Sequence, residues 1–351
     1  NIRLMGQGGG DGTGSNLRGV NIEEGSTIAT TGNGTITIDG TGGNGIDGNS
    51  GIFLGNSSLS TDNGDINLIG EGNPNATGSD NRGINIQDGS QIASGTGNVT
   101  LSGVGGNGIN NNIGIFIDSA TIETEAGDIQ VIGQGGLEAT GTNNDGIFIF
   151  QNSQLVSSNG EITLQAQGGA NNNDSLEVIS ASFDAPLTIE VVNGAINGAI
   201  EGENIITIND INALNEPPFT DEDGVTELSA DISSTSDEII INDAIVLSGN
   251  QTLTGSGITF NETVDSDSTE SPRDLKLDTI NEGLTVFEGA VGSNFPLGNL
   301  QTNADGQTDL NAEEITVTNN QTYNDPILLT EDVTLSSNNV TFNNTVDGDG
   351  N

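Results

Sequence analysis

Carboxylates are by far the most abundant chemically active side chains in this 351-residue chain. There are 50 Asp and Glu residues against five Lys and Arg, with neither His nor Cys. A nucleophilic triad needs a histidine or an equivalent base, and a polysaccharide lyase needs a basic group beside the proton that it abstracts. Only a glycosidase-type pair of carboxylates remains, and so many acidic residues produce such pairs by chance. We therefore expect that the chain is not an enzyme.

Cation binding is the second chemistry that carboxylates support, because Ca²⁺ takes several oxygen ligands at once. The densest acidic positions are the run Asp221, Glu222 and Asp223 and the pair Asp265 and Asp267. We expect weak Ca²⁺ binding there at most, and no cofactor that the fold requires. A solvated acidic surface that keeps chains apart explains the same composition without a cation.

The net charge of −45 restricts the partners. It excludes nucleic acid as a natural partner and disfavours anionic lipid. No apolar run approaches the length of a membrane span, so we expect no membrane insertion. Without cysteine, the fold has no disulfides and no thiolate metal sites.

Three phenylalanines form the most specific apolar pattern in the sequence. Phe53, Phe116 and Phe148 each stand between two aliphatic residues of a predicted strand. Alternation along a strand sends the middle side chain away from the core. The three rings then form either a docking strip for another chain or a cluster covered by loops such as residues 12–19.

These side chains are positioned by a repeat of 30 to 34 residues at the start of the chain. Each copy carries three apolar pairs spaced i, i+2 and separated by Gly, Asn and Ser, which predicts three short strands with one face inward. We expect one inward ladder from the first strands of successive copies. Its members are Ile36, Ile66, Val99, Ile129 and Ile162.

Repeated units of this length that cannot bury a core alone must stack on their neighbours. The repeat therefore predicts an all-β, single-stranded parallel β-helix with three strands per coil. A β-sandwich also has short strands and frequent turns, but it does not repeat its own sequence. We expect a regular β-helix of six coils in residues 1–194, an irregular acidic segment or insertion in 195–240, and a second, less regular solenoid in 241–351.

The repeats of the chain resemble those of a known family. The run from Thr318 to Asp325, followed by Val333-Thr334-Leu335 and Val340-Thr341-Phe342, is similar to repeats of large bacterial surface exoproteins of the filamentous-haemagglutinin-like, two-partner-secretion type, which are also common in cyanobacteria. The Gly-Asn-Gly-Ile and Gly-Ile-Phe-Ile phrases of the first half resemble the haemagglutination-activity repeats of the same proteins. The resemblance implies a right-handed β-helix, export across a Gram-negative envelope, and service as an adhesive or structural rod.

The function that we expect is therefore a non-enzymatic structural or adhesive rod, secreted and displayed on a bacterial cell surface. Its expected partners are neighbouring rods, through self-association, and surface glycans. The alternative is a carbohydrate-binding or carbohydrate-cleaving β-helix of the tailspike type. Both ends of the sequence lie inside a repeat, which we interpret as cuts from a longer polypeptide.

Overall fold

The computed structural model describes residues 1–170, 173–192, 194–211, 214 and 225–348. These residues form 32 strands and no helix. They divide into two compact units, built from residues 1–197 and from residues 198–211 with 225–348, and the boundary falls within β18 (Ala195–Gly202). The pairings whose registers are resolved are parallel, so the chain is an all-β parallel solenoid.

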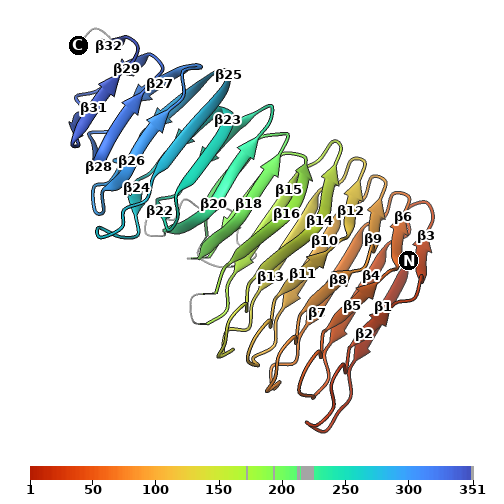
Figure 1. Cartoon of the computed structure of the whole chain (residues 1–351). Helices are drawn as coiled ribbons and strands as arrows, with labels where there is room; N and C mark the ends of the chain where they lie inside the picture. The colour runs from red at the N-terminus through yellow and green to blue at the C-terminus, as the bar shows by residue number, and fades with distance from the viewer. Residues whose placement is uncertain (171–172, 193, 212–213, 215–224, 349–351) are drawn as a thin grey trace. The chain divides into compact units, whose positions relative to one another are not determined.

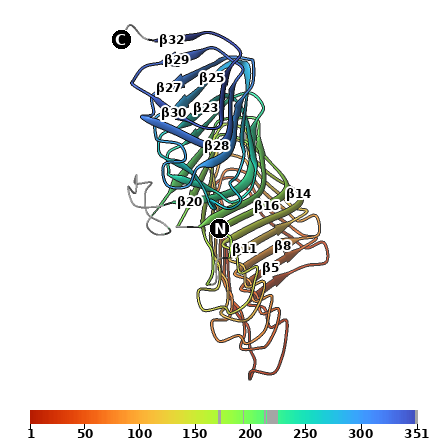
Figure 2. The ribbon, with the colours of Figure 1, turned by 60° about the vertical axis from the view of Figure 1, so that its left-hand side comes forward.

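The first unit consists of three rows of strands that stack side by side (Figure 1). Row one contains β1 (Ile2–Gln7), β4 (Ile36–Thr41), β7 (Ile66–Glu71), β10 (Val99–Val104), β13 (Ile129–Gln134), β15 (Ile162–Gln167) and β17 (Leu187–Val191). Row two contains β2 (Val20–Ile22), β5 (Ile52–Gly55), β8 (Ile84–Gln87), β11 (Ile115–Asp118) and the first halves of β14 (Ile147–Ser157) and β16 (Leu176–Asp184). Row three contains β3 (Thr27–Thr30), β6 (Ser58–Thr61), β9 (Gln91–Ser94), β12 (Thr121–Thr124) and the second halves of β14 and β16. Figure 2 shows the strands of row two beside one another.

The expected inward ladder lies in row one. Ile36 pairs with Ile66, Ile66 with Val99, Val99 with Ile129, and Ile129 with Ile162, always in parallel register. All five side chains are fully buried. This stacking of like on like gives each copy of the repeat a core that it could not bury alone.

A residue with positive φ marks the corner between rows two and three. Polar residues and Gly accept this left-handed conformation more readily than branched ones, because their side chains clash less or bond locally. The corner therefore explains why Asn, Asp or Ser follows the second strand in every copy but the first, where Glu24 takes this conformation. The residues with positive φ at these corners are Glu24, Asn56, Asp88, Ser119, Asn152 and Ser180.

Four buried asparagines, which we call the amide ladder, line the turn before row two. They are Asn49, Asn81, Asn112 and Asn144, each with no exposed surface. The Nδ2 of each of the first three donates to the Oδ1 of the next, over 2.7, 3.1 and 2.9 Å in turn. The ladder gives buried turn amides a partner in every copy.

The second unit also has three rows of parallel strands. One row contains the second half of β20 (Thr226–Ser234), the first halves of β23 (Gln251–Phe260) and β25 (Leu275–Phe287), then β26 (Leu297–Thr302), the second half of β28 (Glu314–Tyr323) and β31 (Asn339–Phe342). Another contains β19 (Ile206–Asp210), β21 (Glu238–Ile241), the second halves of β23 and β25, β27 (Gln307–Leu310), β29 (Ile327–Leu329) and β32 (Val346–Gly348). The third contains the first half of β20, β22 (Ile245–Leu247), β24 (Val264–Ser266), the first half of β28 and β30 (Thr334–Ser336), joined by bridges through Val291.

Regular strands occur inside the segment that the sequence analysis expected to be irregular. Between residues 195 and 240 lie β18, β19, β20 and nearly all of β21. The repeat is lost there, but alternation persists, and Ile206, Ile208 and Ile232 are buried. Pairing in a sheet needs the i, i+2 pattern and not the turn phrases of the repeat, whereas the acidic part of this segment, residues 215–224, lies outside the described residues.

Candidate functional site

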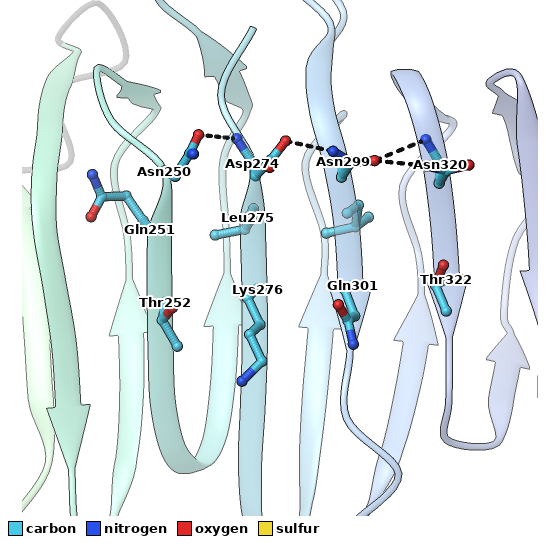
Figure 3. A pocket seen from close by; sticks show the side chains of 11 residues that line it. Asn250, Gln251, Thr252, Asp274, Leu275, Lys276, Asn299, Gln301, Asn320 and Thr322 are labelled. Atoms are coloured by element: carbon cyan, nitrogen blue, oxygen red, sulfur yellow. Dashed lines mark hydrogen bonds between the residues drawn. The ribbon is translucent and has the colours of Figure 1, made fainter.

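A polar groove runs across β23, β25, β26 and β28 on the outward side of the second unit (Figure 3). Its volume is about 400 Å³. Along each lining strand, successive side chains point alternately to the core and to solvent, as strand geometry requires. Leu275 and Leu300 point inward and are 1% exposed, so polar atoms and backbone make up the accessible wall.

One edge of the groove is a row of side chains bonded to one another, which we call the bonded row. It consists of Asn250, Asp274, Asn299 and Asn320. Asn250 Oδ1 accepts from the backbone N–H of Asp274 at 2.9 Å. Asn299 Nδ2 donates to Asp274 Oδ1 at 2.8 Å, and Asn320 Nδ2 donates to Asn299 Oδ1 at 3.0 Å. Figure 3 shows these bonds as one line across four neighbouring strands.

The parallel row two residues along each strand, which we call the open row, is chemically different. It consists of Thr252, Lys276, Gln301 and Thr322, which pair in register. Within the described part of the chain, no hydrogen bond uses the side chains of Thr252, Gln301 or Thr322, whereas Lys276 Nζ bonds Asp278 at 2.5 Å. The open row therefore presents hydroxyl and amide groups that are available to a ligand.

The lining of the groove offers hydrogen-bonding groups and few ionisable side chains. Its ionisable lining residues are Asp274 and Lys276. One oxygen of Asp274 is already bonded to Asn299. The arrangement can hold a polar ligand by many weak hydrogen bonds, but it offers no pair of carboxylates to cleave one.

A second hollow of the second unit is acidic. Its volume is about 660 Å³, and four carboxylates line it together with Ala290 and Asn311. The carboxylates belong to Glu288, Glu313, Glu331 and Asp332. Asn311 Nδ2 donates to Glu288 Oε1 at 2.7 Å. In this hollow, four carboxylate side chains of the described residues surround open space.

The structure describes two of the five positions proposed for weak Ca²⁺ binding. Asp221, Glu222 and Asp223 lie outside the described residues. Asp265 is buried and accepts from the backbone and side chain of Asn294 at 3.0 and 2.9 Å. Asp267 pairs with Arg273 through two bonds of 2.7 and 2.8 Å. Among the described residues, no group of three or more Asp, Glu, His or Cys side chains is arranged to hold a metal ion.

The three outward phenylalanines do not form a bare strip. Phe53 and Phe116 are only 5% and 9% exposed, and Phe148 is half-buried. The guanidinium of Arg18 lies 3.4 Å from the ring centroid of Phe53, and that of Arg82 lies 4.0 Å from Phe116. Both arginines stand in the loops before row two, so loop residues cover the rings. The sequence analysis predicted the outward direction of the three rings and left open whether loops cover them.

A buried acidic group, Asp145, precedes the strand that carries Phe148. The Phe148 ring meets Phe116 edge to face at 5.5 Å. Asp145, two residues before β14, is 2% exposed, and its Oδ2 has no hydrogen-bond partner in the described structure. Burial, followed by the negative charges of Asp174 and Glu177, raises the pKa of Asp145 to about 8. The group is therefore largely protonated at neutral pH.

Sequence reasoning missed the groove and the amide ladder, although both left signals. Asn-Gln-Thr occurs at residues 250–252 and again at 320–322, and the same polar-x-polar spacing recurs at 274–276 and 299–301. An Asn stands three residues before the second strand in four successive copies.

Comparison with protein-family models, curated proteins and solved structures finds no match to this chain. The described residues include no helix that is long and apolar enough to cross a membrane.

Proposed function

We propose that this chain is a right-handed parallel β-helix with three strands in each coil, and that it works as a non-enzymatic structural and adhesive rod on the surface of a bacterial cell. The pairing of each early strand with the third strand after it supports the coil. The strong preference of parallel crossovers for the right hand supports the handedness. The likeness of its repeats to filamentous-haemagglutinin-like exoproteins supports the location.

The observation that carries this proposal is the unbroken stacking of like on like in the first unit. Row one keeps its register from β1 to β17, while the positions between its inward residues vary among charged, polar and apolar types such as Arg3, Asn67 and Ile69. A scaffold needs such a constant interior and tolerates a varied surface. The net charge of −45 keeps neighbouring rods soluble and separate until an attractive contact forms.

Labelling of intact bacteria tests the location and the role together. Antibodies raised against this chain should bind the outside of unpermeabilised cells of the source organism and follow surface fibres in electron micrographs. Deleting the gene should reduce attachment of the cells to surfaces. Labelling that requires permeabilised cells would contradict the proposal.

A carbohydrate-cleaving β-helix is the second candidate, and the acidic hollow is the observation in its favour. If Glu288 and Glu313 acted as acid and nucleophile or base, the chain would release reducing ends from a polysaccharide, and Glu288→Gln with Glu313→Gln would abolish the release. We expect no release by the wild-type chain under conditions in which it binds the same polysaccharide.

A further inference from the structure

The bonded row and the open row run parallel to each other across the sheet and so define the direction in which a ligand would lie. Four strands contribute one residue to each row, and neighbouring strands are about 4.8 Å apart, so the rows extend for about 14 Å across the sheet. The rows run perpendicular to the strands (Figure 3). A ligand that used every position would be extended and would lie across the strands.

From these rows we infer that the groove binds an uncharged polysaccharide chain lying across β23, β25, β26 and β28. The inference rests on the proposed adhesive function and names the class of ligand that this groove binds. Sugar hydroxyls both donate and accept hydrogen bonds, which matches the free amide of Gln301 and the hydroxyls of Thr252 and Thr322. The Lys276 ammonium adds a donor that can reach ring and hydroxyl oxygens.

The bonded row prepares the site. Asn299 Nδ2 donates a hydrogen bond to Asp274, and Asn299 Oδ1 accepts one from Asn320. The orientation of the Asn299 side chain is therefore fixed before any ligand arrives. Asn320 is fixed in turn, since its Oδ1 accepts from Asn339 at 3.1 Å. A ligand that meets this edge therefore does not have to order it, which lowers the entropic cost of binding.

Other ligand classes fit the groove less well. A peptide strand cannot add to the sheet there, because β25 and β26 are already paired on both sides. A metal ion would find the single carboxylate of Asp274, and an apolar ligand would find leucines that are 1% exposed. A polyanion would meet a chain of net charge −45. Uncharged polyhydroxyl chains remain.

The groove contains no aromatic residue on which a sugar ring could stack. Affinity therefore comes from hydrogen bonds that replace bonds to water, each with a small net gain. We expect dissociation constants of roughly millimolar for one groove and one short oligosaccharide. Several copies of the chain on one surface would raise the apparent affinity without a new contact.

The test uses the full chain and an array of neutral and acidic oligosaccharides, followed by titration with the neutral oligosaccharide that binds most strongly. The expected result is binding to neutral oligosaccharides that hardly changes with ionic strength, since no charge pairing is involved. Lys276→Ala combined with Gln301→Ala should weaken binding about tenfold. Gln130→Ala, at an outward position of β13 in the first unit, should leave it unchanged.

Gln301→Ala alone is a safeguard, because the Gln301 side chain is exposed and has no hydrogen-bond partner among the described residues, so its loss does not threaten the fold. Its melting curve should match that of the wild type while binding falls. Binding to no neutral oligosaccharide, binding only to acidic ones, or equal affinity of the wild type and the groove variants would each overturn the inference. None of these results would alter surface labelling, so the two proposals fail separately.

Discussion

The carboxyl group of Asp145 should make stability depend on pH. Its pKa is about 8 in the folded chain, whereas an unfolded chain releases the proton at the usual value of about 4. The folded state therefore holds a proton that the unfolded state has lost. The resulting stabilisation is complete below the unfolded pKa and is lost as pH rises through the folded one.

Replacing Asp145 with Asn removes this dependence. We expect the wild type to melt at falling temperatures as pH rises from about 5 to 8, and Asp145→Asn to show a flatter profile and a higher melting temperature at the alkaline end. Asp184→Asn, on the exposed end of β16, serves as the control and should follow the wild type. Parallel profiles for wild type and Asp145→Asn would show that the group ionises freely.

The arginine that covers Phe116 should be worth measurable stability. Arg82 is 15% exposed at its side chain, stacks on the ring and donates to Asp80 at 2.9 Å. Lysine keeps the charge but loses the planar stacking group. Arg82→Lys should lower the free energy of unfolding by about 0.5 to 2 kcal/mol in urea titrations. Arg3→Lys, at an exposed position of β1, should have no effect, and an equal loss in both variants would refute the assignment.

At the scale of an element, the amide ladder should stabilise the turns before row two. Asn112 Oδ1 accepts from both the backbone and the side chain of Asn81, at 3.2 and 3.1 Å. Asn112→Ala would leave those buried donors unpaired, at a cost of about 1 to 3 kcal/mol. Chemical denaturation measures this loss. Asn67→Ala, at an outward position of β7, is the matched control and should change little.

The strands and the inward ladder could be predicted because their signal repeats. Ile36 and Ile66 recur at equivalent positions, and one face of a strand admits a single apolar register. The amide ladder could not be predicted in the same way, because an Asn in a turn favours the turn whether or not it is buried. Its burial depends on the loops that fold over it.

The groove could not be predicted from the sequence for a related reason. Thr252 and Gln301 are 49 residues apart in the sequence, and the successive positions of the open row are separated by 24, 25 and 21 residues. Only the strand register brings their side chains into one row. For Phe53 the outward direction was predictable, but its covering residue was not, because Arg18 comes from the loop before β2, three strands before β5.

At the scale of the whole molecule, the acidic surface should respond to divalent cations without depending on them. Asp265 and Asp267 have protein partners, so we expect the fold not to require Ca²⁺ at these positions. We expect millimolar Ca²⁺ to promote association of chains, seen by light scattering, relative to sodium chloride at the same ionic strength. A chelator should leave the melting curve unchanged, and complete unfolding in chelator would contradict this expectation.

The central claim is that parallel register gathers outward side chains from separate strands into rows. Because the chain has no native cysteine, a pair of introduced cysteines reports the register cleanly. Gln301 and Thr322 are register partners, so their Cα atoms are about 4.8 Å apart, within reach of a disulfide. The chain with Gln301→Cys and Thr322→Cys should form an intramolecular disulfide under mild oxidation, whereas Gln301→Cys with Asn320→Cys, two residues out of register, should not. Efficient cross-linking of the second pair and none of the first would contradict the account.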